Sequence, residues 1–101
     1  MVMNELLKAF KQLEKIDHST EDEHITNLLQ RSYDKLQRDY GAFETHNPCG
    51  QALVLSRARY EYQDLLEHFN DNYREDLIDF GISQMEVENE NTIQEITYYN
   101  A

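Results

Sequence analysis

The stretch KIDHSTEDEHI, Lys15 to Ile25, places four acidic residues and two histidines in eleven positions. These residue types bind metals and transfer protons. Glu21 and His24 also have the Glu-x-x-His spacing of two-metal carboxylate sites in helical bundles. Such a site needs a second Glu-x-x-His, but leucine stands three residues before His68. The sequence therefore predicts neither a bound metal nor another cofactor.

The same stretch also has the features of a helix start. Thr20 and Glu23 have the spacing of a capping box, in which the threonine hydroxyl accepts a helix N–H and the glutamate accepts the threonine N–H. The acidic residues at 21–23 complement the positive end of the helix dipole. We predict a helix that begins at Thr20 and is capped by Thr20 and Glu23.

Covalent catalysis finds little support in the sequence. The single cysteine, Cys49, follows Pro48 near a predicted helix start, where a thiolate is stabilised, but the spacing identifies no histidine partner. Phosphate-binding glycine loops, nucleophile elbows and zinc-finger spacings do not occur. We predict a protein that is not an enzyme, and bound metal in the purified protein would support the metalloenzyme alternative.

Hydrophobic periodicity predicts the elements that position these residues. Apolar residues recur at helical spacing in three segments, at about 2–15, 20–40 and 50–80. Gly41 follows the second segment as a C-terminal cap. In the third, the cluster FNDN at 69–72 competes for backbone hydrogen bonds and predicts a kink or break. The expected fold is all-α, a small bundle of three main helices.

Residues 82–101 have a different composition. They contain four acidic residues, no lysine or arginine, and a β-branched and aromatic end. We expect a helical domain at 1–81 and an acidic extension at 82–101 that is mobile in the free chain and ordered on assembly. The predicted partner-docking residues in this extension are Ile93, Ile96, Tyr98 and Tyr99.

The charge is strongly negative and unevenly distributed. The net charge is -11, and residues 61–101 carry one basic residue against eleven acidic ones. This charge argues against a general nucleic-acid binder, because affinity for phosphates comes from basic residues. The predicted acidic surface comprises Glu61, Asp64, Glu67, Asp71, Glu75 and Asp79. With no signal peptide, no membrane-spanning run and one cysteine, we expect folding in a reducing cytoplasm and no membrane partner.

The order of these features resembles the small head-tail connector proteins of long-tailed bacteriophages, also called head-completion or adaptor proteins. The residues that carry the resemblance are Leu13, Ile16, Asp17, His18, Glu21, Asp22, Ile25, Leu29 and Tyr33, then Ala52, Leu53, Leu55, Tyr60 or Tyr62, Glu67 and Phe69. It covers about residues 6 to 80. The family usually has a small residue where Tyr33 stands.

The resemblance implies a protein of the virion, at the head-tail interface, that is assembled in the host cytoplasm. Its copies would form a ring, typically twelve-fold, on the portal protein and extend the channel toward a stopper or tail-completion protein. DNA would pass through without specific binding, and the acidic surface of Glu61 to Asp79 would line or approach the channel. The alternative function is an acidic DNA mimic or regulatory protein that binds a basic partner as a monomer.

Overall fold

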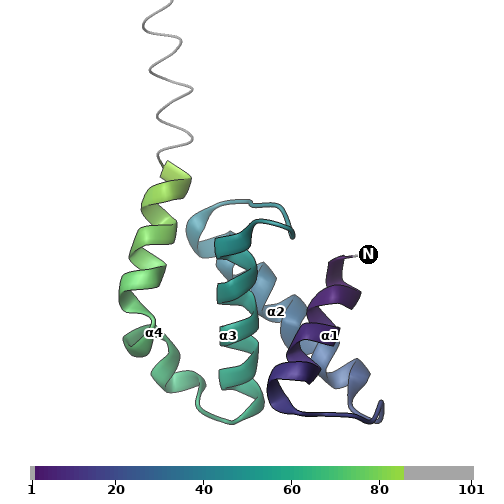
Figure 1. The fold of residues 1–101 in the computed structure, drawn as a ribbon. Coiled ribbons are helices and arrows are strands. Elements are labelled where there is room, and N and C mark those ends of the chain that lie inside the picture. The colour runs from purple at the N-terminus through teal and green to yellow at the C-terminus, as the bar shows by residue number, and fades with distance from the viewer. Residues whose placement is uncertain (1, 86–101) are drawn as a thin grey trace, which may run out of the picture.

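The computed structural model describes residues 2–85, and this part of the chain consists of helices joined by turns (Figure 1). The elements are α1 (Val2–Glu14), α2 (Asp22–Tyr40), α3 (Pro48–Tyr62), the 3-10 helix η1 (Leu66–His68), α4 (Phe69–Asn72) and a helical segment at 74–85. The predicted all-α class is confirmed for these residues, which include no strand. None of these helices is both long and apolar enough to span a membrane.

The core lies where α1, α2 and α3 meet. Phe10 of α1, Ile25 and Leu29 of α2, and Ala58 of α3 are fully shielded from solvent. Each large apolar side chain buried in this way contributes about 1.5–3 kcal/mol to the transfer free energy. The buried residues of α2 recur at helical spacing on one face, so the amphipathic pattern of the sequence places this helix against both neighbours.

The two predicted ends of α2 have different outcomes. Gly41 is the C-cap, with a φ of 95° and its N–H donated to the carbonyl of Gln37 at 2.9 Å, which confirms the prediction. The predicted capping box is wrong. The helix begins at Asp22 with Glu21 at the N-cap and no side-chain cap bond, while the Thr20 hydroxyl lies 2.8 Å from His18 Nδ1. Thr20 and the exposed Glu23 are therefore one residue out of register for a box.

The third predicted helix, at about 50–80 with a kink or break at 69–72, is wrong before that break, because α3 ends at Tyr62 and the chain reverses at 63–65. Asp64 takes a left-handed conformation with a φ of 61°, which Asp tolerates better than most residues. The Leu65 N–H bonds back to the Tyr60 carbonyl at 2.7 Å. The apolar spacing continues through the reversal because α3 and the helical segment after it both bury one side in the same hydrophobic core.

The reversal creates a second arm that runs back along α3, and we call residues 66–85 the C-terminal arm (Figure 1). Its helix is interrupted at Tyr73, directly after FNDN, which confirms the predicted break there. Tyr73 still accepts the N–H of Leu77 at 2.8 Å, so the arm is bent and continuous. The helix of the arm continues past residue 80, where the third predicted helix ends, and reaches residue 85.

One aromatic residue in the loop after α2 attaches this arm to the body. The ring of Phe43 is 5.1 Å from that of Tyr33 in α2 and 5.0 Å from that of Phe80 in the arm, both edge to face. Phe43 also lies directly against Gly50 of α3, where a Cβ would collide with its ring. Gln84 completes the attachment by donating to the carbonyls of Gly41 and Ala42 at 3.1 and 3.0 Å.

Gly50→Ala tests this close contact. Alanine is favoured over glycine in a helix by about 1 kcal/mol, so an open site would gain stability. Here the added methyl group meets the Phe43 ring, and overpacking costs about 1–3 kcal/mol. We expect a lower midpoint of urea unfolding. The control is Gly50→Ala in a Phe43→Leu background, where the substitution should lose its cost, and a raised midpoint with Phe43 present would contradict the packing.

Candidate partner-docking surface

The stretch KIDHSTEDEHI forms the turn between α1 and α2 and the first turn of α2. Ile16 is half-buried and donates its N–H to the Lys11 carbonyl at 2.8 Å, while Lys11 Nζ bonds Asp22 Oδ1, also at 2.8 Å. His18 and His24 are exposed. No group of three or more His, Cys, Asp or Glu side chains suited to a metal occurs within 2–85. The contacts of Lys11 with Ile16 and Asp22 therefore connect α1 to α2 across this turn.

Glu21, the carboxylate of the Glu-x-x-His spacing, is engaged by a different residue. Its Oε2 accepts a hydrogen bond from the Tyr62 hydroxyl at 2.9 Å, which ties the start of α2 to the end of α3. This hydrogen bond, with desolvation and the charges of Glu21 and Glu14, raises the pKa of Tyr62. Phe10 meets the same tyrosine ring edge to face at 5.3 Å. The spacing of Glu21 and Tyr62 in the sequence does not predict this contact.

Tyr33 connects α2 to the loop that follows it. Its hydroxyl donates to the Phe43 carbonyl at 2.7 Å while its ring packs against the ring of Phe43. Burial, followed by the charges of Glu44 and Asp34, raises the pKa of Tyr33. Tyr33 thus positions the loop that holds the C-terminal arm.

The six residues of the predicted acidic surface do not share one face, because the chain reverses at 63–65, between Glu61 and Glu67. Glu61 belongs to the body and bonds Arg31 at 2.9 Å, with Arg57 at 3.8 Å. Its buried Oε1 has no hydrogen-bond partner within the described chain. Burial lowers the pKa of Arg57, and Glu61 opposes this by favouring the charged form. Glu61 is therefore an internal counter-ion.

The other acidic residues are exposed, but they point in different directions. Asp64 occupies the reversal, and Glu67 and Glu75 lie on the outside of the arm. Asp71 pairs with Arg74 at 3.2 Å. Asp79 lies with Asp76, which the sequence analysis did not single out, along a groove beside α3. The negative charge is concentrated on the arm, without forming a single stripe.

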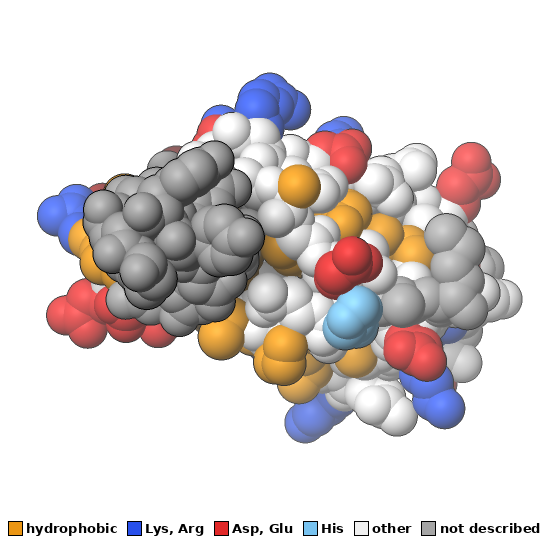
Figure 2. Space-filling model, turned by 90° about the horizontal axis from the view of Figure 1, so that it is seen from above, with side chains coloured by type: hydrophobic (Ala, Val, Ile, Leu, Met, Phe, Trp, Pro, Cys, Tyr) orange, Lys and Arg blue, Asp and Glu red, His pale blue; other side chains and the backbone are white. Residues whose placement is uncertain are grey.

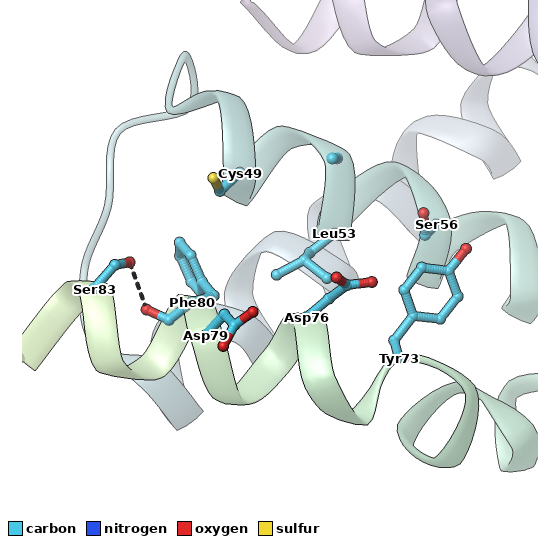
Figure 3. Close-up of a pocket in the computed structure, with 9 residues that line it drawn as sticks. Cys49, Leu53, Ser56, Tyr73, Asp76, Asp79, Phe80 and Ser83 are labelled. Atoms are coloured by element: carbon cyan, nitrogen blue, oxygen red, sulfur yellow. Dashed lines mark hydrogen bonds between the residues drawn. The ribbon is translucent and has the colours of Figure 1, made fainter.

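This groove runs between α3 and the C-terminal arm and has a volume of about 370 Å³ (Figure 3). Leu53 of α3 and Phe80 of the arm form its floor, and both are nearly fully buried. Cys49 and Ser56 line the α3 side, and Asp76, Asp79 and Ser83 line the arm, with Tyr73 at one end and Ala52 on α3. The groove thus combines an apolar floor with two carboxylates on one rim.

A second exposed feature lies on another side of the arm. Ile78, Ile82 and Met85 are 53%, 48% and 61% exposed and follow one another at helical spacing. Figure 2, which looks onto one end of the molecule, shows hydrophobic side chains at the surface with acidic ones nearby. We call these three residues the arm stripe. The sequence does not reveal it, because the apolar spacing over 50–80 predicts a buried face and residues 82–101 have the composition of an extension.

The predicted docking residues Ile93, Ile96, Tyr98 and Tyr99 lie outside the described residues. In the sequence, however, the arm stripe continues toward two of them: residues 78, 82, 85, 89, 93 and 96 keep the average helical period of about 3.6. All of these except Asn89 are apolar. The arm stripe and two of the predicted docking residues, Ile93 and Ile96, therefore belong to one sequence pattern.

Comparison of the chain with protein-family models, with curated proteins and with solved structures found no match.

The Glu21–Tyr62 hydrogen bond makes a testable prediction about alkaline stability. The folded pKa of Tyr62 is raised, so its stabilising effect is complete below the unfolded pKa of about 10 and is lost as pH rises through the folded pKa. Tyr62→Phe should therefore lose less stability than the unmodified chain above that pH in thermal unfolding. Glu21→Gln should fall between the two, and parallel pH profiles for all three would contradict the bond.

Proposed function

We propose that this protein is a non-enzymatic assembly protein of a bacteriophage virion. In this role it forms a ring, typically twelve-fold, that docks on the portal protein. The ring links the DNA-filled head to a stopper or tail-completion protein and extends the DNA channel. The proposal begins with the resemblance of residues 6 to 80 to small head-tail connectors.

The observation that carries the proposal is the arm stripe. Three large apolar side chains stand on one side of a helix, and each is about half exposed or more. In soluble proteins, an exposed apolar patch of this kind is usually a surface that a partner covers in the complex. Since a helix presents apolar anchors at this spacing when it lies in a groove of another protein, the arm has the form of a docking element. The same arm carries Asp71, Glu75 and Asp79. Their like charges oppose self-association of the free chain through the arm stripe.

The acidic composition fits passage of DNA without binding. Residues 61–101 carry eleven acidic residues and one basic one, and like charge repels the phosphate backbone. In a ring, such a surface near the channel would let DNA slide. We retain Asp64, Glu67, Glu75 and Asp79 as candidates for the channel side, whereas the charge of Asp71 is compensated by Arg74. Glu61 is withdrawn from that set because Arg31 and Arg57 compensate its charge.

The test mixes the purified chain with isolated portal rings and images the mixture by electron microscopy. A symmetric ring added beneath the portal is the expected result. The variant Ile78→Ser/Ile82→Ser should remain helical by circular dichroism but bind portals at least about tenfold more weakly, because burial of each isoleucine supplies about 1.5–3 kcal/mol. Leu13→Ser, which alters an apolar residue of α1 that is 50% exposed, is the matched control.

A well-folded chain that leaves portals bare, both alone and with DNA-filled capsids, would overturn the proposal. The alternative, an acidic DNA mimic or regulator, is favoured by the concentration of exposed carboxylates on the arm. It predicts tight binding of the monomer to a basic protein, with affinity that falls steeply as salt rises. Binding of that kind, with no ring on any portal, would favour the mimic.

A further inference from the structure

The groove between α3 and the C-terminal arm is long, and its α3 wall is made of small side chains. Cys49, Ala52 and Ser56 form this wall, and none of them is charged (Figure 3). Cys49 and Ala52 are exposed, so the wall is open to solvent. On the arm the lining extends from Tyr73 to Ser83, a rise of about 15 Å at the helical rise of 1.5 Å per residue. The groove therefore has the length of a short helix.

The arm wall carries negative charge that the chain does not compensate. Asp76 and Asp79 border the groove, are exposed and stand one helical turn apart. They take part in none of the ion pairs formed within residues 2–85, and no lysine or arginine of this part of the chain lines the groove. Asp71 on the same arm, in contrast, pairs with Arg74. An occupant that brings cations to Asp76 and Asp79 would supply the missing partners.

The floor of the groove restricts the chemistry of the occupant further. Leu53 and Phe80 form this floor, so an occupant that covers it presents apolar side chains. A small hydrophilic cation would leave the floor uncovered. A wholly apolar segment would desolvate Asp76 and Asp79 without giving them partners, which costs free energy. The two walls and the floor together therefore fit a segment that is apolar on one side and basic along one edge.

We propose that the groove between α3 and the C-terminal arm binds a basic amphipathic helix of another protein. Apolar residues of this helix, one turn apart, lie over Leu53 and Phe80. Lysines or arginines along the edge that faces the arm, also one turn apart, pair with Asp76 and Asp79. A helix suits the groove because the small α3 wall lets its backbone come close, while long basic side chains reach across to the arm.

The groove and the arm stripe are different surfaces of the same arm. Asp76, Asp79 and Phe80 line the groove, whereas Ile78 and Ile82 are exposed on another side of the helix. Both surfaces can be occupied at the same time, so the inference goes beyond the proposed function and does not depend on it. An occupied groove compensates the charge of Asp79 and leaves the other exposed carboxylates of the arm free.

Fluorescence anisotropy with a designed peptide tests the groove. The peptide is an alanine-based helix of about 15 residues that carries two leucines and two arginines, each pair one turn apart and adjacent on one face. It should bind the unmodified chain and still bind at about 0.5 M salt, because salt does not screen the apolar part of the contact. Asp76→Asn/Asp79→Asn, which keeps the shape of the side chains, should weaken binding at least about fivefold because both arginines lose their partners.

Three variants separate the groove from the general attraction of an acidic chain for a basic peptide. Glu67→Gln/Glu75→Gln removes the same charge outside the groove and should stay within about twofold of the unmodified chain, since exposed distant charges are screened. Ala52→Gln keeps the charge, obstructs the groove and should weaken binding. Ile78→Ser/Ile82→Ser should leave binding unchanged. Equal weakening by the two charge variants, undiminished binding to Ala52→Gln, or loss of binding in the Ile78→Ser/Ile82→Ser variant would each overturn the proposal.

The single cysteine supplies a second measurement on the unmodified protein. Cys49 lines the groove and is exposed, so a bound helix should shield its thiol from N-ethylmaleimide, an uncharged reagent. When the peptide occupies about nine grooves in ten, the reaction should slow by roughly tenfold, because only the free fraction reacts. No binding at millimolar peptide, or binding that leaves Cys49 as reactive as in the free chain, would overturn the proposal.

Discussion

The packing of the C-terminal arm against the rest of the structure depends on the position of Phe43. The loop after α2 carries this ring to a point where α2, α3 and the C-terminal arm meet, and each helix contributes one matching feature. Tyr33 supplies a ring edge and a hydrogen bond, Gly50 supplies the space, and Phe80 supplies the opposing ring. Without this junction the arm would lose its main attachment near the N-terminal end of α3, and the distance between α3 and the arm would no longer be fixed.

The sequence was sufficient for the elements whose signals are local. The amphipathic pattern predicted α1 and α2, and Gly41 marked the end of α2, because periodicity and the left-handed cap are properties of neighbouring residues. The reversal at 63–65 carries no glycine or proline, and the apolar spacing continues through it, so the sequence predicted one long helix. The start of α2 was misplaced because His18, and not the helix, takes the Thr20 hydroxyl.

The candidate surfaces depend on that missed reversal. An unbroken helix would have placed Glu61 and Asp79 on one continuous face, whereas the folded chain gives Glu61 to Arg31 and Arg57 and turns Asp79 toward α3. The groove forms between α3 and the C-terminal arm, which are separate segments of the chain. The arm stripe is the exposed side of a helix whose other side is buried. Composition located the negative charge correctly on the second half of the chain, while only the tertiary arrangement shows which carboxylates border apolar area.

The one-sided attachment of the C-terminal arm has a consequence for how the protein opens. The arm is fixed by Phe69 and Tyr73 beside Tyr60, by Phe80 beside Phe43, and by Gln84, whereas the residues around Phe10, Ile25 and Leu29 belong to the three other helices. Phe69, Leu77 and Phe80 of the arm belong to the same hydrophobic core as these residues, so detachment of the arm exposes its own share of that core while Phe10, Ile25 and Leu29 stay packed between the other helices. The arm has the properties of a separate cooperative unit, whose amide hydrogens exchange through sub-global opening at a lower free energy than global unfolding.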